Sequence, residues 1–129
     1  MAKTKKRRSE PKVKILEIFL GILNAIKLYH WSTFSYAKHK ATDELYSRLN
    51  EHIDKFVEVM MGKTGRRIPE YSKRILATSG NFTTQIHNYR DFLMRLGELL
   101  DETDTDLLSI RDEILADVNQ FLYLMTLTK

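Results

Sequence analysis

The segment 36–61, YAKHKATDELYSRLNEHIDKFVEVMM, decides the fold, because its apolar residues recur with the period of an α-helix. Each residue of a helix advances by about 100° around the axis and by about 1.5 Å along it. On this wheel the apolar residues lie within roughly 80° of Leu45, and a stripe of that width predicts a face packed in a core. The stripe comprises Leu45, Leu49, Ile53, Phe56 and Met60.

A second face of the same helix, at roughly 120° to 220° from Leu45, carries residues of the kind that bind metals. These residues are His39, Asp43, Asp54 and Glu58. Val57 and Met61 project into the same face, and this mixture favours carboxylates packed against another surface over a fully solvated face. Either i, i+4 pair alone is ordinarily a solvated face or a local hydrogen bond. Both pairs together, with His30 just upstream, favour a metal site.

One helix cannot close this site, because His39 and Asp54 lie about 22 Å apart along its axis. A metal needs its ligands within about 2 to 2.2 Å. Two copies packed antiparallel across a two-fold axis would place His39 and Asp43 of one copy against the second carboxylate pair of the other, at two symmetric sites. His30 would fold back toward His39. Two imidazoles with two or three carboxylates suit iron or zinc, and the oxygen ligands favour iron.

The run from Lys27 to Gly62, KLYHWSTFSYAKHKATDELYSRLNEHIDKFVEVMMG, resembles the signature of the Dps or mini-ferritin family. That signature has His-Trp, then His-x3-Asp, then Asp-x3-Glu, and the matching positions here are His30, His39, Asp43, Asp54 and Glu58. The loop between the two histidines is three residues shorter than the usual pattern. Residues 119–125, NQFLYLM, resemble the family's last helix. The run is also similar to an uncharacterised ferritin-like family of large DNA viruses.

The resemblance implies a ferritin-like four-helix bundle with a ferroxidase centre shared between two subunits. His30 and His39 of one subunit would hold iron together with Asp54 and Glu58 of the partner. Asp43 would position a second iron or a water. The resemblance also implies a closed homo-oligomeric shell that is built from dimers, contains twelve subunits and stores the oxidised iron.

The remaining helical patterns agree with an all-α bundle. Apolar spacing predicts helices from Pro11 to Trp31, from Phe82 to Leu100 and from about Thr105 to Met125. We expect Gly62 and Gly65 to end the second helix, and residues 68–77 to be a connector that is a loop or a short helix. Four amphipathic helices with one longer connector between the second and third are typical of a four-helix bundle.

The first residues form a basic segment with one acid, Glu10. Its cations are Lys3, Lys5, Lys6, Arg7, Arg8, Lys12 and Lys14. This composition predicts a flexible arm over 1–12, ahead of a bundle domain over 13–129. Such an arm would bind DNA without sequence preference and with a steep salt dependence, as the tails of some Dps proteins do. A nuclear-localisation signal and a solubility tail are the alternatives.

Length and composition restrict the classes of protein. The chain has 129 residues, of which 43% are hydrophobic, so it can bury one core. No run approaches the roughly 20 apolar residues of a membrane span, so we expect no membrane partner. The lack of cysteine excludes disulfides and thiolate metal sites and fits a cytoplasmic or nucleoid-associated protein. The viral resemblance makes a virion or an infected host cell the alternative location.

Other arrangements are less favoured by the sequence. A metal site inside one bundle needs Glu-x-x-His, and no histidine here has a carboxylate three residues before it. His52 and His87 are interpreted as structural or solvated, and Trp31 as an aromatic buried beside a helix end. The competing class of function is a structural or nucleic-acid-packaging protein that keeps the bundle and performs no redox chemistry.

Overall fold

A computed structural model describes the backbone of residues 2–66 and 81–127 and the side chains of residues 13–66 and 81–127. Its helices are α1 (Ala2–Ser32), α2 (Tyr36–Thr64), α3 (Phe82–Arg95), the short 3-10 helix η1 (Leu96–Leu99) and α4 (Thr105–Met125). The described residues contain no strand. The prediction of an all-α chain with four main helices is therefore confirmed.

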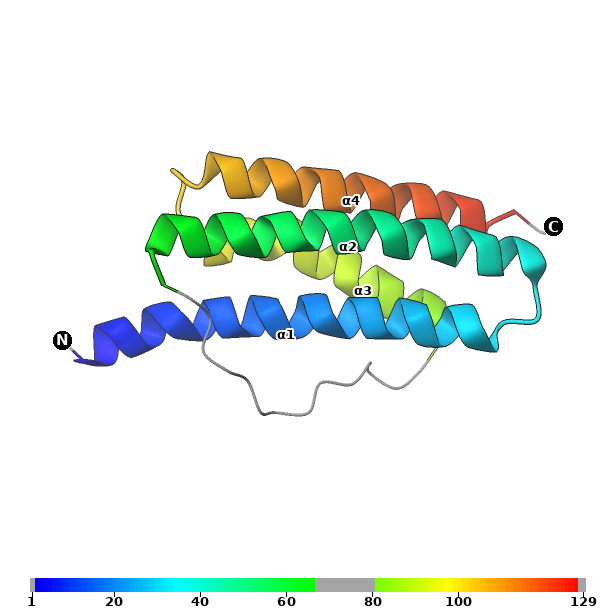
Figure 1. The fold of residues 1–129 in the computed structure, drawn as a ribbon, viewed down its shortest axis with the longest axis horizontal. Coiled ribbons are helices and arrows are strands. Elements are labelled where there is room, and N and C mark those ends of the chain that lie inside the picture. Colours follow the sequence, from blue (N-terminus) through cyan, green and yellow to red (C-terminus); the bar gives the residue numbers. More distant parts are fainter. Residues whose placement is uncertain (1, 67–80, 128–129) are drawn as a thin grey trace.

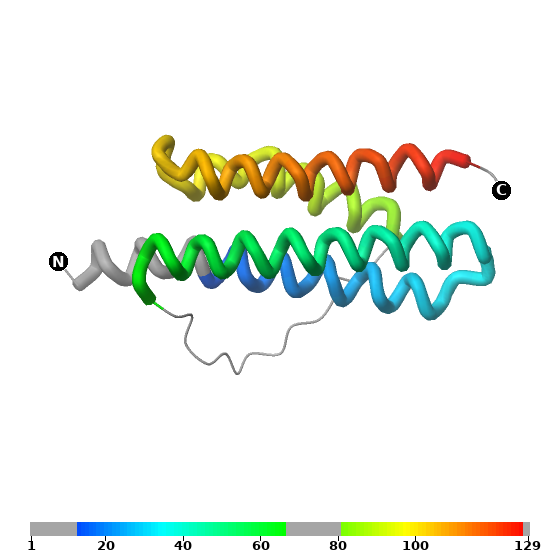
Figure 2. Tube along the Cα trace, turned by 45° about the horizontal axis from the view of Figure 1, so that its top comes forward, coloured from blue at the N-terminus to red at the C-terminus, as the bar shows by residue number. Residues whose placement is uncertain are grey.

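The four helices form an elongated bundle (Figure 1). α2 packs against α1 and α4, while α3 packs against α4 and α1. α1 and α2 run antiparallel, as do α3 and α4 (Figures 1 and 2). α2 and α3 run in the same direction, because α2 ends at the end of the bundle opposite to the one where α3 begins (Figure 1).

The predicted apolar stripe of α2 forms the centre of the core, since all five of its residues are buried. Phe56 is fully buried and meets Phe19 of α1 edge to face, with ring centroids 5.2 Å apart. Phe82 of α3 stacks on Tyr29 of α1 and meets Phe121 of α4 edge to face. Aromatic contacts therefore join α1 to α2 and α3, and α3 to α4.

The ends of α2 have recognisable caps. The hydroxyl of Ser35 accepts a hydrogen bond from the backbone N–H of Lys38, and Gly65 ends the helix with φ at 69°. The prediction that Gly62 ends the helix is wrong, because the helix continues through it to Thr64. α3 is shorter than predicted, since η1 replaces its last turn beside Gly97, a poor helix former.

The structure tests only part of the prediction that a flexible arm over 1–12 precedes a bundle domain over 13–129. The backbone of residues 2–12 continues α1 as a helix, where the sequence suggested a flexible arm. The side chains of residues 1–12, and the predicted connector over 68–77, lie outside the described residues. In the part of the chain that is described, no helix is long and apolar enough to cross a bilayer.

Candidate metal site

Two of the predicted ligands meet at the junction of α1 and α2. His30 lies near the end of α1 and His39 lies in the first turns of α2. Their imidazole rings stack, with centroids 3.8 Å apart and planes inclined by 18°. The short connection between the two helices therefore brings the histidines together.

Each imidazole is oriented by the backbone of the other helix. His30 donates from Nδ1 to the carbonyl oxygen of His39 over 2.8 Å, and His39 donates from Nδ1 to that of His30 over 2.9 Å. A carbonyl oxygen only accepts, so the proton of each neutral ring sits on Nδ1. Nε2 then keeps its lone pair. Metal-binding histidines have this arrangement, because the second nitrogen's hydrogen bond sets the tautomer and the ring orientation.

The hydroxyl of Thr42 completes this hydrogen-bond network. Its side chain is fully buried on α2. The hydroxyl donates to the carbonyl oxygen of Lys38 over 2.8 Å and lies 3.1 Å from Nδ1 of His30. Sequence reasoning missed Thr42. The available signal was its position three residues after His39, on the side of α2 that bears the apolar stripe.

The carboxylates lie elsewhere on α2. Asp43, Asp54 and Glu58 are all exposed. Asp43 follows His39 by one turn, whereas Asp54 is about 22 Å from His39 along the helix. Within the described residues of one chain, no three histidine, aspartate or glutamate side chains form a group able to hold a metal. One chain thus presents the histidines at one position and the second carboxylate pair several turns away.

Two aromatic rings lie near Lys27, which precedes His30 by three residues on α1. Nζ of Lys27 lies 4.5 Å from the ring centroid of Tyr46 and 5.7 Å from that of Trp31. Such distances are typical of cation–π contacts. Trp31 is 68% exposed, so the prediction that it is buried beside the helix end is wrong.

The other two histidines are not ligands in this arrangement. His52 joins α2 to α4, since its Nδ1 lies 2.9 Å from Oδ2 of Asp117 and its Nε2 lies 3.5 Å from Oε2 of Glu113. Its structural interpretation is confirmed. The partners were not visible in the sequence, because they lie 61 and 65 residues further along the chain. His87 is exposed on α3, as expected of a solvated residue.

Comparisons with known proteins show a family and two partial relatives. The model of a family of unknown function, DUF5856, matches residues 30–125. An uncharacterised 14.6 kDa protein of Enterobacteria phage T4, from the mobD-ri intergenic region, is 44% identical over 63 residues. Exocyst complex component 6B of Homo sapiens is 33% identical over 81 residues. These matches cover 43% and 53% of this chain, but only 49% of the phage protein and 10% of the human one. No solved structure matches significantly.

Proposed function

The chain belongs to the DUF5856 family, and we propose that it captures Fe(II) at a site shared by two copies and oxidises it, in the manner of a Dps-like protein. The observation that carries this proposal is the His30–His39 pair. Both imidazoles are held by backbone carbonyls through Nδ1 and present Nε2 for a metal.

A single register of two antiparallel α2 helices brings both sets of proposed ligands together. If two copies of α2 lie antiparallel with His39 opposite Glu58, the same register places Asp43 opposite Asp54. The three carboxylates are exposed on the described surface, so no side chain of the same chain has to move before the partner arrives. A two-fold axis then generates two identical sites.

The stacking geometry favours one ion per imidazole. A ligated metal lies close to the plane of each ring that binds it, and these nearly parallel rings have centroids 3.8 Å apart. A single ion cannot lie in both planes at a normal Fe–N distance of about 2.1 Å. The sequence suggested that both histidines hold one iron. We propose instead that His30 and His39 bind two separate ions, with Asp43 beside the ion held by His39.

The directions of the helices support the assignment of this bundle to the ferritin-like class. Parallel α2 and α3 joined by one long connection are typical of ferritin-like bundles. Iron oxidised by peroxide or dioxygen from solution would then be stored inside a shell of dimers, with twelve subunits as the resemblance implies. Zinc suits the same ligands and would act as a competitor.

The basic segment supplies a second part of the proposal. Of its cations only Lys14 lies among the described side chains, and it is exposed. We propose that the segment binds DNA through phosphates, so affinity should fall steeply with salt. This suits a cytoplasmic or nucleoid-associated protein. The similarity to a phage protein supports the alternative, a structural or packaging role in a virion or an infected cell.

The test is aerobic Fe(II) oxidation followed by near-ultraviolet absorbance, with and without peroxide. We expect oxidation faster than buffer, and a loss of that excess in the double variant Asp54→Ala, Glu58→Ala. The matched control is Asp91→Ala, Glu98→Ala, which removes two exposed carboxylates on α3 and η1 and should oxidise iron normally. A native protein that oxidises iron no faster than buffer would favour the structural or packaging role.

A further inference from the structure

One end of the bundle exposes an unusual set of apolar side chains. The connection from α1 to α2, the start of α3 and the end of α4 all lie at this end (Figures 1 and 2). Phe34, in the connection, is fully exposed, and Trp31 is 68% exposed. The exposed apolar residues of this region, called the aromatic end below, are Leu28, Trp31, Phe34, Tyr36, Tyr123 and Leu127.

The aromatic end carries more positive than negative charge, although Glu44 lines the cavity at this end. No aspartate or glutamate occurs in residues 18–42, 81–90 or 118–127, which are the described segments that build it. Lys27, Lys38 and Lys40 lie in the same segments. The acidic residues of the turn before α4 are at the opposite end of the molecule. The aromatic end is therefore complementary to an anionic surface.

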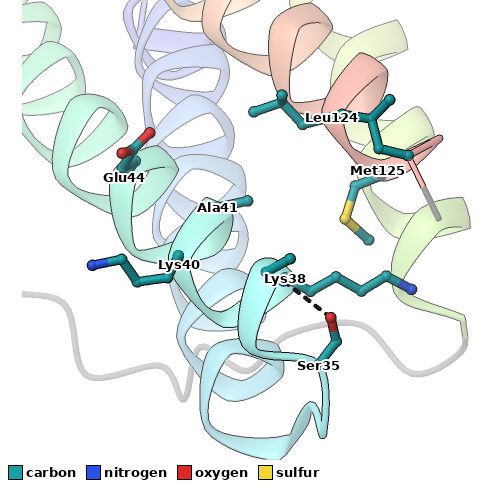
Figure 3. Close-up of a pocket in the computed structure, with 9 residues that line it drawn as sticks. Ser35, Lys38, Lys40, Ala41, Glu44, Leu124 and Met125 are labelled. Carbon is teal, nitrogen blue, oxygen red and sulfur yellow. Dashed lines mark hydrogen bonds between the residues drawn. The ribbon is translucent and has the colours of Figure 1, made fainter. Parts of the chain in front are cut away.

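A cavity of about 240 Å³ opens between the start of α2 and the end of α4, at the aromatic end (Figure 3). Its apolar lining includes Ala37 and Ala41 of α2 and Leu124 and Met125 of α4, and its charged lining comprises Lys38, Lys40 and Glu44. The side chain of Lys38 extends across it toward Met125 (Figure 3). Apolar walls beside two ammonium groups and one carboxylate suit a molecule with an apolar chain and an anionic head.

We propose that the aromatic end docks on a lipid surface that contains anionic headgroups. Tryptophan, tyrosine and phenylalanine side chains settle at the level of the headgroups, where their apolar bodies leave water. Each lysine near such a surface adds attraction to anionic lipids. This docking is peripheral and needs no spanning helix, so it differs from the membrane contact that the sequence argued against. It does not rest on the metal site.

Two other partners fit the same surface less well. Single-stranded nucleic acid is bound by aromatic rings along a basic groove, whereas here the rings stand on separate elements around a protruding connection. Leu28 and Leu127 offer no ring to a base. A second copy that met this end with its own aromatic end would bring lysines of like charge together.

Trp31 reports directly on the proposal, because it is the only tryptophan in the chain. We expect its emission to shift to the blue, and its quenching by acrylamide to fall, with vesicles of phosphatidylcholine and phosphatidylglycerol. Vesicles of phosphatidylcholine alone should give a much smaller change. The double variant Phe34→Ser, Tyr36→Ser keeps the reporter and should weaken partitioning by about tenfold or more, since each ring removes apolar area from water on docking.

The matched control is Met94→Ser. Met94 is 61% exposed, but it lies at the far end of α3, so vesicle binding should not change. Circular dichroism of both variants checks that the bundle is folded. Vesicle binding with unchanged Trp31 emission would mean attraction by the basic segment alone and would overturn the proposal. A blue shift produced by an oligonucleotide or by higher protein concentration, and not by vesicles, would overturn it too.

Discussion

At the scale of single residues, the candidate site depends on a hydroxyl that is not itself a ligand. Thr42 is fully buried and lies between the carbonyl oxygens of α2 and Nδ1 of His30. Its contact with Nδ1 of His30 crosses from α2 to α1, so it restricts the position of His30 beside His39. A residue with no metal-binding chemistry thus adds to the orientation that the backbone carbonyl of His39 gives to His30.

We therefore expect Thr42→Val to loosen His30 while the core stays filled. The free energy of unfolding should fall by about 1 kcal/mol, which is typical of a lost hydrogen bond. Affinity for Zn(II) or Co(II) should fall by about 10-fold to 100-fold, as for other residues that orient ligands. Urea melts and metal titrations measure the two effects. Thr83→Val, at an exposed position of α3, is the control; unchanged metal affinity in Thr42→Val would refute the orienting role.

At the scale of elements, the two ends of α2 are capped in different ways. The N-terminal end is capped by Ser35 and the C-terminal end by Gly65. In the last turn before that cap, Lys63 reaches the start of α4, where its Nζ lies 2.8 Å from Oδ1 of Asp104 and 2.7 Å from Oδ1 of Asp106. Together with the His52 contacts in the middle of the helix, these interactions attach α2 to α4 along its length.

Two glycines near the end of α2 should respond oppositely to the same substitution. Gly62 lies inside the helix with nothing within 4 Å of an added Cβ, so Gly62→Ala should stabilise the protein by about 0.5 to 1 kcal/mol. Gly65 has equal space but a φ of 69°, so Gly65→Ala should cost about 1 kcal/mol or more. Each variant is the control for the other in urea melts. A loss of stability in both would mean that α2 ends before Gly62.

The Lys63 cluster predicts a dependence of stability on pH. Hydrogen bonds from Lys63 hold the pKa values of Asp104 and Asp106 below the usual 3.8, and hydrogen bonds to both carboxylates raise the pKa of Lys63 above 10.5. Because the folded carboxylates have the lower pKa, their contribution is present above 3.8 and is lost as the pH falls toward their folded values. The contribution of Lys63 is present below 10.5 and is lost as the pH rises toward its raised value.

Lys63→Met should thus lower stability slightly at neutral pH, as expected of an exposed ion pair, and much less at about pH 2. Thermal melts of the variant and the native protein across this range measure the difference. Lys55→Met, which removes an exposed lysine from the same helix, should show no such trend. A difference between Lys63→Met and the native protein that stays constant from neutral to acid pH would exclude the ion pair as its cause.

At the scale of the whole molecule, the proposed pairing links association to metal. The register that joins His39 to Glu58 also sets Asp43 against Asp54, and like charges repel unless a cation lies between them. The exposed face of α2 is therefore poorly suited to self-association without metal. A cation bound between the carboxylates of the two copies would replace this repulsion with attraction.

We expect Zn(II), or Fe(II) without oxygen, to increase the mass of the protein in solution, and a chelator to reverse the increase. Metal at about one hundred times its dissociation constant should favour the associated state by about 2.7 kcal/mol per site. Sedimentation velocity measures the mass. In the variant Asp43→Asn, Asp54→Asn, association should become insensitive to the chelator. A native protein whose mass never responds to metal would rule out the shared site, though not the docking of the aromatic end.

Residue spacing alone determined much of this protein. The period of the apolar residues placed the core face of α2 correctly, because a helix presents every third or fourth residue to one side. The same periodicity put the ligand-type residues on one separate face of α2. Spacing did not determine where α2 ends, since an isolated glycine inside a helix costs only about 1 kcal/mol and packing overrides it.

Only the tertiary structure decided which distant residues meet. The stacking of His30 on His39, the contact of the Thr42 hydroxyl with His30 and the attachment of His52 to Asp117 all join different helices. The exposure of Trp31 and the position of the aromatic end also depend on how the helix ends are placed relative to one another. Helix periodicity is a local property of the chain, whereas these contacts depend on the packing of whole helices, which no spacing within one helix encodes.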